Sequence, residues 1–383
     1  MSVYLDNAAT TKVDPKVMEA MLPFLSGTYG NPSSIHSFGR ESKAAIEKSR
    51  KKVAELLNTS PSSIFFTSGG TEADNFAIVR SIQQFGIKKA ITSPLEHHAV
   101  LHTLEYLHKS GEVELEILEV DSKGNLNHDQ LKKSLESGPQ TFVSLMQGNN
   151  EIGTLNPVLE ISDLVKAHKG IFHSDTVQTV GHYKHDLSSW KIDFMVGAGH
   201  KFHGPKGIGF IYVSPDVKIS PLIHGGAQER NMRGGTENIS GIVGLATALD
   251  IAYSEMEPHR SHIEGLKSLM ISRLKAGIPD VQFNGESESL QKSLYTVLNV
   301  STPPSEMNEM LIFNLDINKI CASGGSACSS GSELGSHVLR GIQADPNRGA
   351  VRFSFGKYNT VEDIEYAAQI LTKMYAQKEL VLQ

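Results

Sequence analysis

The sequence predicts an α/β protein in which a mostly parallel sheet forms a large domain and a smaller α+β domain follows it. First, short apolar runs alternate with segments of helical spacing from about residue 60 to 215, and this alternation is typical of a parallel sheet covered on both faces. Second, strand-like runs interleaved with helical segments dominate the chain beyond about residue 258. Third, 383 residues exceed one ordinary hydrophobic core, which favours two domains.

The expected elements follow one another in a regular order. Seven apolar runs are expected to be buried strands of the large domain: 63–67, 89–93, 114–118, 142–146, 170–175, 193–199 and 207–213. Amphipathic segments are expected to be helices at 68–85, 99–111, 158–170, 241–256 and 256–277. Runs at 280–286, 295–302, 309–323 and 350–356, interleaved with helices, are expected in the small domain. Pro258 lies near the boundary, so we assign 13–257 to the large domain and 1–12 and 258–383 to the small one.

Composition excludes several classes of function. The net charge of −6 argues against nucleic acid or an anionic membrane as the main partner. The N-terminus lacks a basic region followed by an apolar run, and no apolar stretch approaches the roughly 20 residues that span a bilayer. Two cysteines seven positions apart do not make a disulfide framework, so a reducing cytoplasm is the simplest compartment.

The stretch "TSGGTEADN" predicts a place where an anion can bind. A strand ends there, two glycines turn the chain, and a helix begins near Gly70 and Thr71. The free N–H groups and the dipole of a helix N-terminus favour a negative charge. The alternative is an ordinary turn in which Thr71 caps the helix. Phosphate-loop and dinucleotide motifs are absent, which argues against nucleotide binding by those routes.

Two charged residues follow expected strands of the sheet. Asp175 comes directly after one of them, where ligands of α/β proteins bind. Lys201 follows the next strand among small residues, and partial burial would lower its pKa and suit it to Schiff-base chemistry. The alternatives are a surface aspartate and a solvated lysine, and Lys206 competes with Lys201, which lies nearer the strand end.

The histidine pairs at 97–98 and 200/203 do not have metal-ligand spacing. Neither HExxH nor a paired CxxC is present, so no metal site is expected. His97 can instead lie flat against a planar cofactor, or it can be a hydrogen-bonded loop histidine. Near the C-terminus, the planar fork of Arg352 can hold a carboxylate, although a surface ion pair is the alternative.

Cys328 lies in "ASGGSACSSGS", at about 321–336, where nothing is large enough to bury it. A loop of small residues has little apolar area to anchor it and is expected to move. Because an idle exposed thiol is prone to oxidation, an incidental cysteine is the weaker interpretation. Cys321 is expected to be a small buried residue.

Ten stretches, in order, resemble the cysteine desulfurases, pyridoxal-phosphate enzymes of fold type I, which is the aspartate-aminotransferase fold. The stretches are "YLDNAATT", "GNPSSIHSFG", "FTSGGTEADN", "SPLEHHAV", "NNEIG", "HSDTVQTVG", "GHKFHGPKGIG", "RGGTEN", "GSACSSGS" and "VRFSFG". They span residues 4–356, nearly the whole chain. The "GSAC" motif in a long Gly/Ser loop is similar to the class I (NifS/IscS-like) desulfurases.

The resemblance implies how the cofactor is held. Lys201 would bind it covalently, and Asp175 would pair with the ring nitrogen and keep it protonated. Gln178 would hydrogen-bond the ring hydroxyl, and His97 would stack on the ring face.

A second group of residues would hold the cofactor's phosphate. Gly70, Thr71 and His200 would contact it, and Thr236 would reach the phosphate of the partner subunit, which implies a homodimer. Many relatives have Ser two residues before the His of the "HK" pair, whereas this chain has Ala198. A contact worth roughly 1.5–3 kcal/mol is therefore absent or is made by a backbone N–H or a water.

The resemblance also implies the reaction, with Cys328, Lys201 and His97 as the catalytic side chains. Asn150 and Arg352 would hold the carboxylate of L-cysteine, and Lys201 would take the Cα proton. The Cys328 thiolate would attack the substrate sulfur, L-alanine would leave, and the persulfide would pass to an acceptor protein. The acceptor could serve iron–sulfur cluster assembly, nitrogenase maturation or tRNA thiolation.

Other functions use the same fold. An aminotransferase or a kynureninase-like lyase has no use for a loop thiol, whereas a selenocysteine lyase remains an alternative. A non-catalytic member of the family is expected to have lost Lys201, Asp175 or Cys328, and all three are present.

Overall fold

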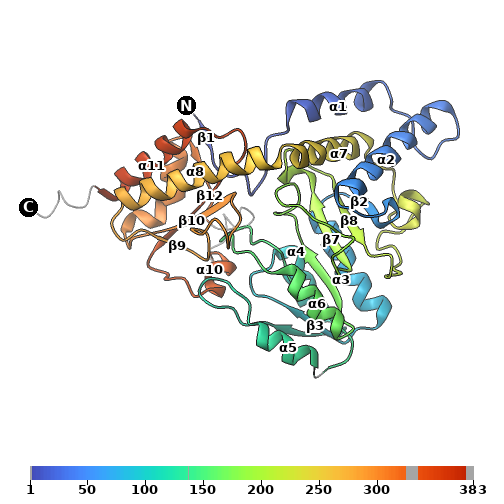
Figure 1. Ribbon diagram of the computed structural model, residues 1–383, viewed down its shortest axis with the longest axis horizontal. Helices are drawn as coiled ribbons and strands as arrows, with labels where there is room; N and C mark the ends of the chain where they lie inside the picture. Colours follow the sequence, from blue (N-terminus) through green and yellow to red (C-terminus); the bar gives the residue numbers. More distant parts are fainter. Residues whose placement is uncertain (1, 137, 325–334, 377–383) are drawn as a thin grey trace, which may run out of the picture.

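The computed structural model describes residues 2–136, 138–324 and 335–376, and its larger part is built on a seven-stranded sheet (Figure 1). The strands lie in the order β2-β8-β7-β6-β5-β3-β4. Their bounds are β2 Ile64–Thr67, β3 Lys89–Thr92, β4 Glu114–Ile117, β5 Thr141–Ser144, β6 Ile171–Asp175, β7 Phe194–Ala198 and β8 Gly209–Val213. All seven expected strands therefore form.

The sheet is mostly parallel, as predicted. Only β8 runs antiparallel, and it does so to both of its neighbours, β2 and β7. One expectation is wrong: β4 is not buried. It forms the edge of the sheet, where β3 is its only neighbour, so Glu114 and Ile117 remain exposed.

Helices cover both faces of this sheet. Neighbouring residues of a strand point to opposite faces, so each face carries apolar side chains that pack against helices. Phe65 packs with α3 and α4, whereas Phe66 packs on the other side with α2 and α7. The helices of this part are α1 Pro15–Ser26, α2 Ser37–Leu56, α3 Gly70–Phe85, α4 His98–Lys109, α5 His128–Glu136, α6 Val158–Ala167 and α7 Ile239–Ser254. Helices α1 and α2 lie in a region to which the sequence assigned no element.

Among the residues that the structure describes, the smaller part contains two short sheets and four α-helices. Its strands are β1 Val3–Tyr4, β9 Gln282–Phe283, β10 Val297–Thr302, β11 Ile320–Cys321 and β12 Gly349–Ser354. They pair as β12-β10-β9 and β1-β11. The helices are α8 Met256–Gly277, α9 Leu311–Ile317, α10 His337–Gly341 and α11 Val361–Ala376.

The N-terminal strand belongs to this smaller part. Val3 and Leu5 are buried with Met270, Val300 and Phe353 in a core separate from the two cores of the large sheet. The 22-residue helix α8 runs from the large part along the small one (Figure 1). The boundaries at 12/13 and 257/258 stay a prediction.

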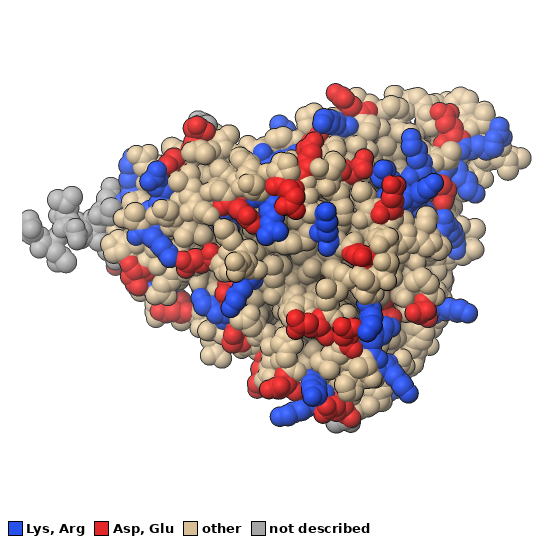
Figure 2. All heavy atoms as spheres, in the orientation of Figure 1, with Lys and Arg blue, Asp and Glu red and all other residues tan. Residues whose placement is uncertain are grey.

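The visible surface carries charges of both signs. Lys and Arg side chains are interspersed with Asp and Glu over the face in Figure 2, and no large region of one sign stands out there. In the described part of the chain, no helix is both long and apolar enough to cross a membrane.

Candidate active site

A cavity of about 240 Å³ lies at the carboxyl ends of the central parallel strands. Asp175 is the last residue of β6 and Ala198 is the last residue of β7, and both line the cavity. Ligands of α/β proteins bind at this edge of the sheet. The other lining residues are Ala8, Ala9, Gly70, Thr71, Asp74, His97, Met146, Asn150, Val177, Gln178, His200, Lys201 and Arg352.

Lys201 reaches the cavity from the short 3₁₀ turn Gly199–Lys201 that follows β7. Its Nζ donates to the carbonyl oxygens of Ala8 (2.6 Å) and Ala9 (2.9 Å). The N-terminal segment that carries these two carbonyl groups thus positions the Lys201 amine. Lys206, the competing residue, is exposed and does not line the cavity.

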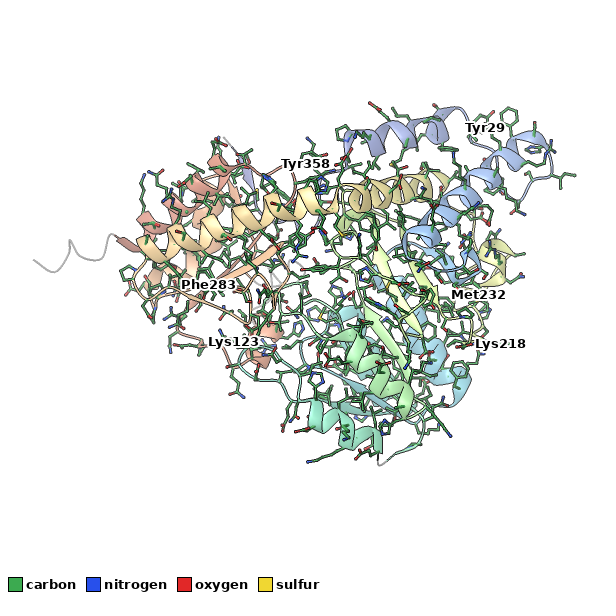
Figure 3. The ribbon with its side chains drawn as sticks, viewed as in Figure 1. Tyr29, Lys123, Lys218, Met232, Phe283 and Tyr358 are labelled. Carbon is green, nitrogen blue, oxygen red and sulfur yellow. The ribbon has the colours of Figure 1, made fainter. Side chains whose placement is uncertain are left out.

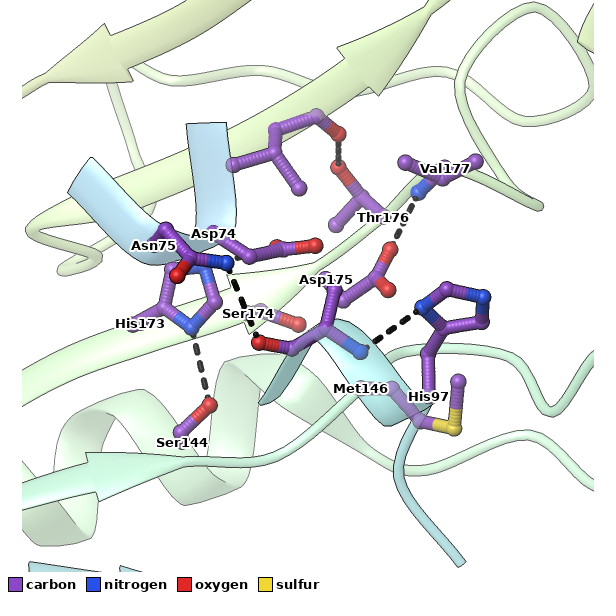
Figure 4. A network of polar contacts seen from close by, with 12 residues as sticks. Asp74, Asn75, His97, Ser144, Met146, His173, Ser174, Asp175, Thr176 and Val177 are labelled. Atoms are coloured by element: carbon purple, nitrogen blue, oxygen red, sulfur yellow. Dashed lines mark hydrogen bonds and ion pairs between the residues drawn. The ribbon is translucent and has the colours of Figure 1, made fainter. Parts of the chain in front are cut away.

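Asp175 and His97 lie next to each other at the cavity (Figure 4). The Asp175 carboxylate accepts the N–H of Val177 at 2.9 Å. Burial raises the pKa of Asp175, whereas His97, this N–H and Lys201 lower it. The net effect is a raised pKa, so a cation in the cavity would be a strong partner that stabilises the charged form of Asp175.

The position of His97 at the start of α4 selects its tautomer. Its Nδ1 accepts the N–H of Ala99 at 3.1 Å and so caps the helix. Burial lowers the pKa of His97, with opposing contributions from Asp175 and Lys201. The ring is therefore neutral with its proton on Nε2, which suits both stacking and proton transfer.

The N-terminus of α3 opens into the same cavity. Its N-cap is Gly69 and no side chain caps it, so the alternative that Thr71 caps the helix is wrong. A Cβ at Gly70 would come within 2.8 Å of Val177 Cγ2, so a side chain would fill the space beside the free N–H groups. His200 lies in the turn after β7, and its Nδ1 is 3.1 Å from Thr10 Oγ1.

Arg352 approaches from β12 of the smaller part. Its Nη1 donates to the Asn150 carbonyl oxygen at 2.9 Å, and its Nη2 pairs with Asp6 Oδ1 at 2.8 Å. Its buried Nε has no hydrogen-bond partner among the described residues. Gln178 is also buried at the cavity, and its Nε2 donates to the Ala8 carbonyl oxygen at 3.0 Å.

One expected site residue, Thr236, does not come to this cavity within the single chain. Thr236 is exposed and lines a separate pocket of about 200 Å³ beside Arg233 and Asn238. Cys328 lies outside the described residues. Cys321 is half-buried, not buried as expected, because the two-residue strand β11 lies beside a large open pocket.

Sequence reasoning assigned no role to Asp74, Met146, Ala8 or Ala9, all of which line the cavity. The two alanines lie in "YLDNAATT", but a carbonyl oxygen gives no residue-type signal. Asp74 lies four residues after Gly70 in the helix that begins at the expected anion site. This position was the sequence signal that could have identified it as a residue of the cavity.

Asp74, His97 and Asp175 each offer one nitrogen or oxygen, and these three atoms all lie within 4.8 Å of one another. It is the only such grouping of three potential metal ligands in the part of the chain that the structure describes. The absence of a metal stays a prediction.

Comparison with known proteins decides the family. The model for aminotransferase class-V matches residues 3–367. The chain is 43% identical over 373 residues to a putative cysteine desulfurase IscS 1 of Bacillus subtilis, covering 96% of this chain and 97% of the relative. It is 42% identical over 381 residues to cysteine desulfurase IscS of Clostridium botulinum, covering 98% and 95%. This chain belongs to the cysteine desulfurases of the aminotransferase class-V family.

Solved structures agree with this membership. A NifS-like protein superposes with a TM-score of 0.90 at 38% identity, covering 98% of this chain and 100% of that one. A structure described as SspA in complex with cysteine has a TM-score of 0.81 at 30% identity, covering 94% and 100%. The prediction of a class I, NifS/IscS-like member with the type I fold of pyridoxal-phosphate enzymes is confirmed.

Cysteine desulfurases depend on pyridoxal phosphate, and this cavity fits that group. The uncapped start of α3, with the space that only Gly70 leaves, matches a phosphate. The buried Asp175 matches a protonated ring nitrogen, and the Lys201 amine lies in the same cavity. Ala198 lines the cavity and supplies no hydroxyl there.

Proposed function

We propose that this cysteine desulfurase converts L-cysteine to L-alanine and passes the sulfur through Cys328 to an acceptor protein. The observation that carries the proposal is the convergence of Lys201, Asp175 and His97 on one cavity. These side chains come from the end of β6, the turn after β7 and the start of α4, and a surface lysine or a purely structural histidine is not expected at a shared cavity.

In this proposal Lys201 holds the cofactor, Asp175 faces its ring nitrogen, Gln178 its hydroxyl and His97 its ring face. Gly70, Thr71 and His200 hold its phosphate. When bound, pyridoxal phosphate supplies an electron sink for the bonds at the substrate Cα.

The chain's own groups would then orient the substrate and move its protons. Arg352 would bind the substrate carboxylate through the Nε that has no partner among the described residues, and Asn150 would flank it. The Lys201 amine, held by two carbonyl oxygens, would take the Cα proton. His97 would hold a proton at Nε2 for return to the substrate.

Sulfur transfer is assigned to Cys328. Its thiolate would attack the substrate sulfur, so that an S–S bond forms and the Cβ–S bond breaks. The electron pair of the broken bond stays with the substrate carbon, which takes a proton to become L-alanine. One thiol and one cysteine thus give one persulfide and one alanine, with no external oxidant.

We also propose a homodimer in which Thr236 reaches the phosphate site of the other subunit. An exposed apolar group on α1 and the segment after it supports an interface between copies, because monomers seldom expose such groups. Its members are Leu22, Leu25, Tyr29 and Ile35, of which Ile35 is 90% exposed. Figure 3 shows Tyr29 at the outer end of this region.

The acceptor is proposed to be an iron–sulfur scaffold or another sulfur-carrier protein. A free thiol persists where the medium is reducing, which favours a cytoplasmic location.

Three variants test the proposal. Lys201→Ala should still bind pyridoxal phosphate, but sodium borohydride should no longer fix it to the protein, as mass spectrometry reports. Cys328→Ala should keep the covalently held cofactor and lose formation of alanine and sulfane sulfur. Cys321→Ala is the matched control and should keep both. Full turnover in Cys328→Ala would remove the assigned nucleophile.

A further inference from the structure

Three carboxyl groups are buried together beside and beneath the cavity. Asp74 is 1% exposed, Asp175 5% and Glu96 0%. Asp74 and Asp175 each place an oxygen within a 4.8 Å group that also includes His97. Two carboxylates so close in a water-poor place repel each other, and the charge of Glu96 adds to the repulsion at Asp74, so the three do not all ionise.

The hydrogen bonds of the three carboxyl groups differ. Asp175 accepts the Val177 N–H at 2.9 Å. Glu96 accepts the Ser93 hydroxyl at 2.9 Å and the N–H of Met146 at 3.0 and 3.1 Å. Asp74 Oδ1 has no hydrogen-bond partner among the described residues, although His173 Nε2 lies 3.3 Å away.

His173 does not supply a positive charge to Asp74. The ring is fully buried in β6 between Ser144 and Asp74 (Figure 4), and its Nδ1 lies 2.8 Å from Ser144 Oγ. Burial lowers the pKa of His173 to about 3, so the imidazole is neutral. Burial, followed by the charges of Asp175 and Glu96, holds the pKa of Asp74 well above its ordinary value.

We propose that Asp74 is a positioning residue that stays protonated and shares a hydrogen bond with neutral His173, so that Asp175 is the one carboxylate charge that faces the cofactor ring. Either tautomer of His173 fits this arrangement. If Ser144 donates to Nδ1, then Nε2–H donates to Asp74; if Nδ1–H donates to Ser144, the Asp74 hydroxyl donates to Nε2. A second charge at Asp74 would favour protonation of Asp175 and would weaken its pairing with the ring.

The first test reads the protonation state directly and needs no substrate. Infrared spectra are recorded of the holoenzyme with ¹³C-labelled aspartate, which excludes signals from Glu96. We expect a protonated aspartic acid band that persists across neutral pH and disappears in Asp74→Asn. Asp193→Asn is the matched control, since Asp193 is equally buried but pairs with Lys166 at 2.5 Å, and it should remove a carboxylate band instead.

Loss of a carboxylate band in Asp74→Asn would overturn the inference. If that variant does not fold, the labelled wild-type protein decides alone, because absence of any protonated aspartate band at neutral pH would overturn it equally. Neither result depends on cysteine turnover, so failure of the proposed function and failure of this inference are distinguishable.

The second test asks whether Asp74 acts on the cofactor site, on which the inference rests. Asp74→Asn should keep the absorption band of bound pyridoxal phosphate, and its pH titration, as in the wild type. Asp74→Ala should release pyridoxal phosphate roughly tenfold more readily, because His173 loses its partner. A shifted titration in Asp74→Asn, or equal retention in Asp74→Ala and wild type, would contradict the positioning role.

Discussion

Replacing Arg352 by lysine keeps the positive charge and removes the planar fork. In the structure, one N–H of Nη1 donates to the Asn150 carbonyl oxygen at 2.9 Å and one N–H of Nη2 donates to Asp6 at 2.8 Å. Its buried Nε has no partner among the described residues, and in the proposed function this donor binds the substrate carboxylate. A lysine Nζ is a single point and does not reach all three acceptors.

The expected loss of kcat/KM follows from the one hydrogen bond to the substrate that lysine would not make. One charge-assisted hydrogen bond to the substrate is worth roughly 1.5–3 kcal/mol, and each 1.4 kcal/mol is a factor of about ten. Arg352→Lys should therefore lower kcat/KM for L-cysteine by roughly 10- to 150-fold. The contact is made equally to bound substrate and transition state, so most of the change should appear in KM.

The assay is alanine formation over a range of L-cysteine concentrations, with the cofactor spectrum recorded to show that the site is loaded. Arg348→Lys is the matched control. Arg348 also has a largely buried side chain, just before β12, and pairs with Asp280 at 2.7 Å, but it does not line the cavity. A KM within threefold of wild type for Arg352→Lys, or an equal rise in both variants, would refute the assignment.

Three further predictions concern the framework of the site. Glu229→Gln leaves Arg50 without the buried carboxylate now 2.7 and 2.8 Å away, so the free energy of unfolding should fall by about 3–5 kcal/mol in urea titrations; a fall under about 1 kcal/mol contradicts this. Burial lowers the pKa of Lys267 to about 7 from 10.5. Between these two pKa values the unfolded chain binds more protons than the folded chain, so the free energy of unfolding rises with pH. Lys267→Met should flatten the rise of the urea midpoint with pH, and an unchanged slope counts against this assignment. Ala198→Ser should slow release of pyridoxal phosphate roughly three- to tenfold in gel-filtration or dialysis measurements, whereas faster release would mean that the hydroxyl does not fit.

The alternation of strands and helices was readable in the sequence because hydrophobic periodicity and glycine turns are local signals. The segment from Ile64 to Phe85 is an example: the strand, the turn and the helix all lie where they were expected. Burial of 114–118 was not readable, since the composition of a strand does not say whether a second neighbour pairs with it. The order of strands decides that, and it placed β4 at the edge.

The family and its candidate residues were determined by the sequence alone, because the chemistry needs particular side chains in a particular order. Lys201 and Asp175 were proposed from their types and their places after strands, and His97 from its ring and the resemblance to the family. Only the folded chain decided that the carbonyl oxygens of Ala8 and Ala9 hold the lysine, and that helix capping selects the His97 tautomer. Only it brought Asp74 beside His173 and Asp175. The physical reason is distance. The contacts of Lys201 and of Asp74 act over a few ångströms in space, between residues about 100 to 190 positions apart in the chain, and no local pattern records them.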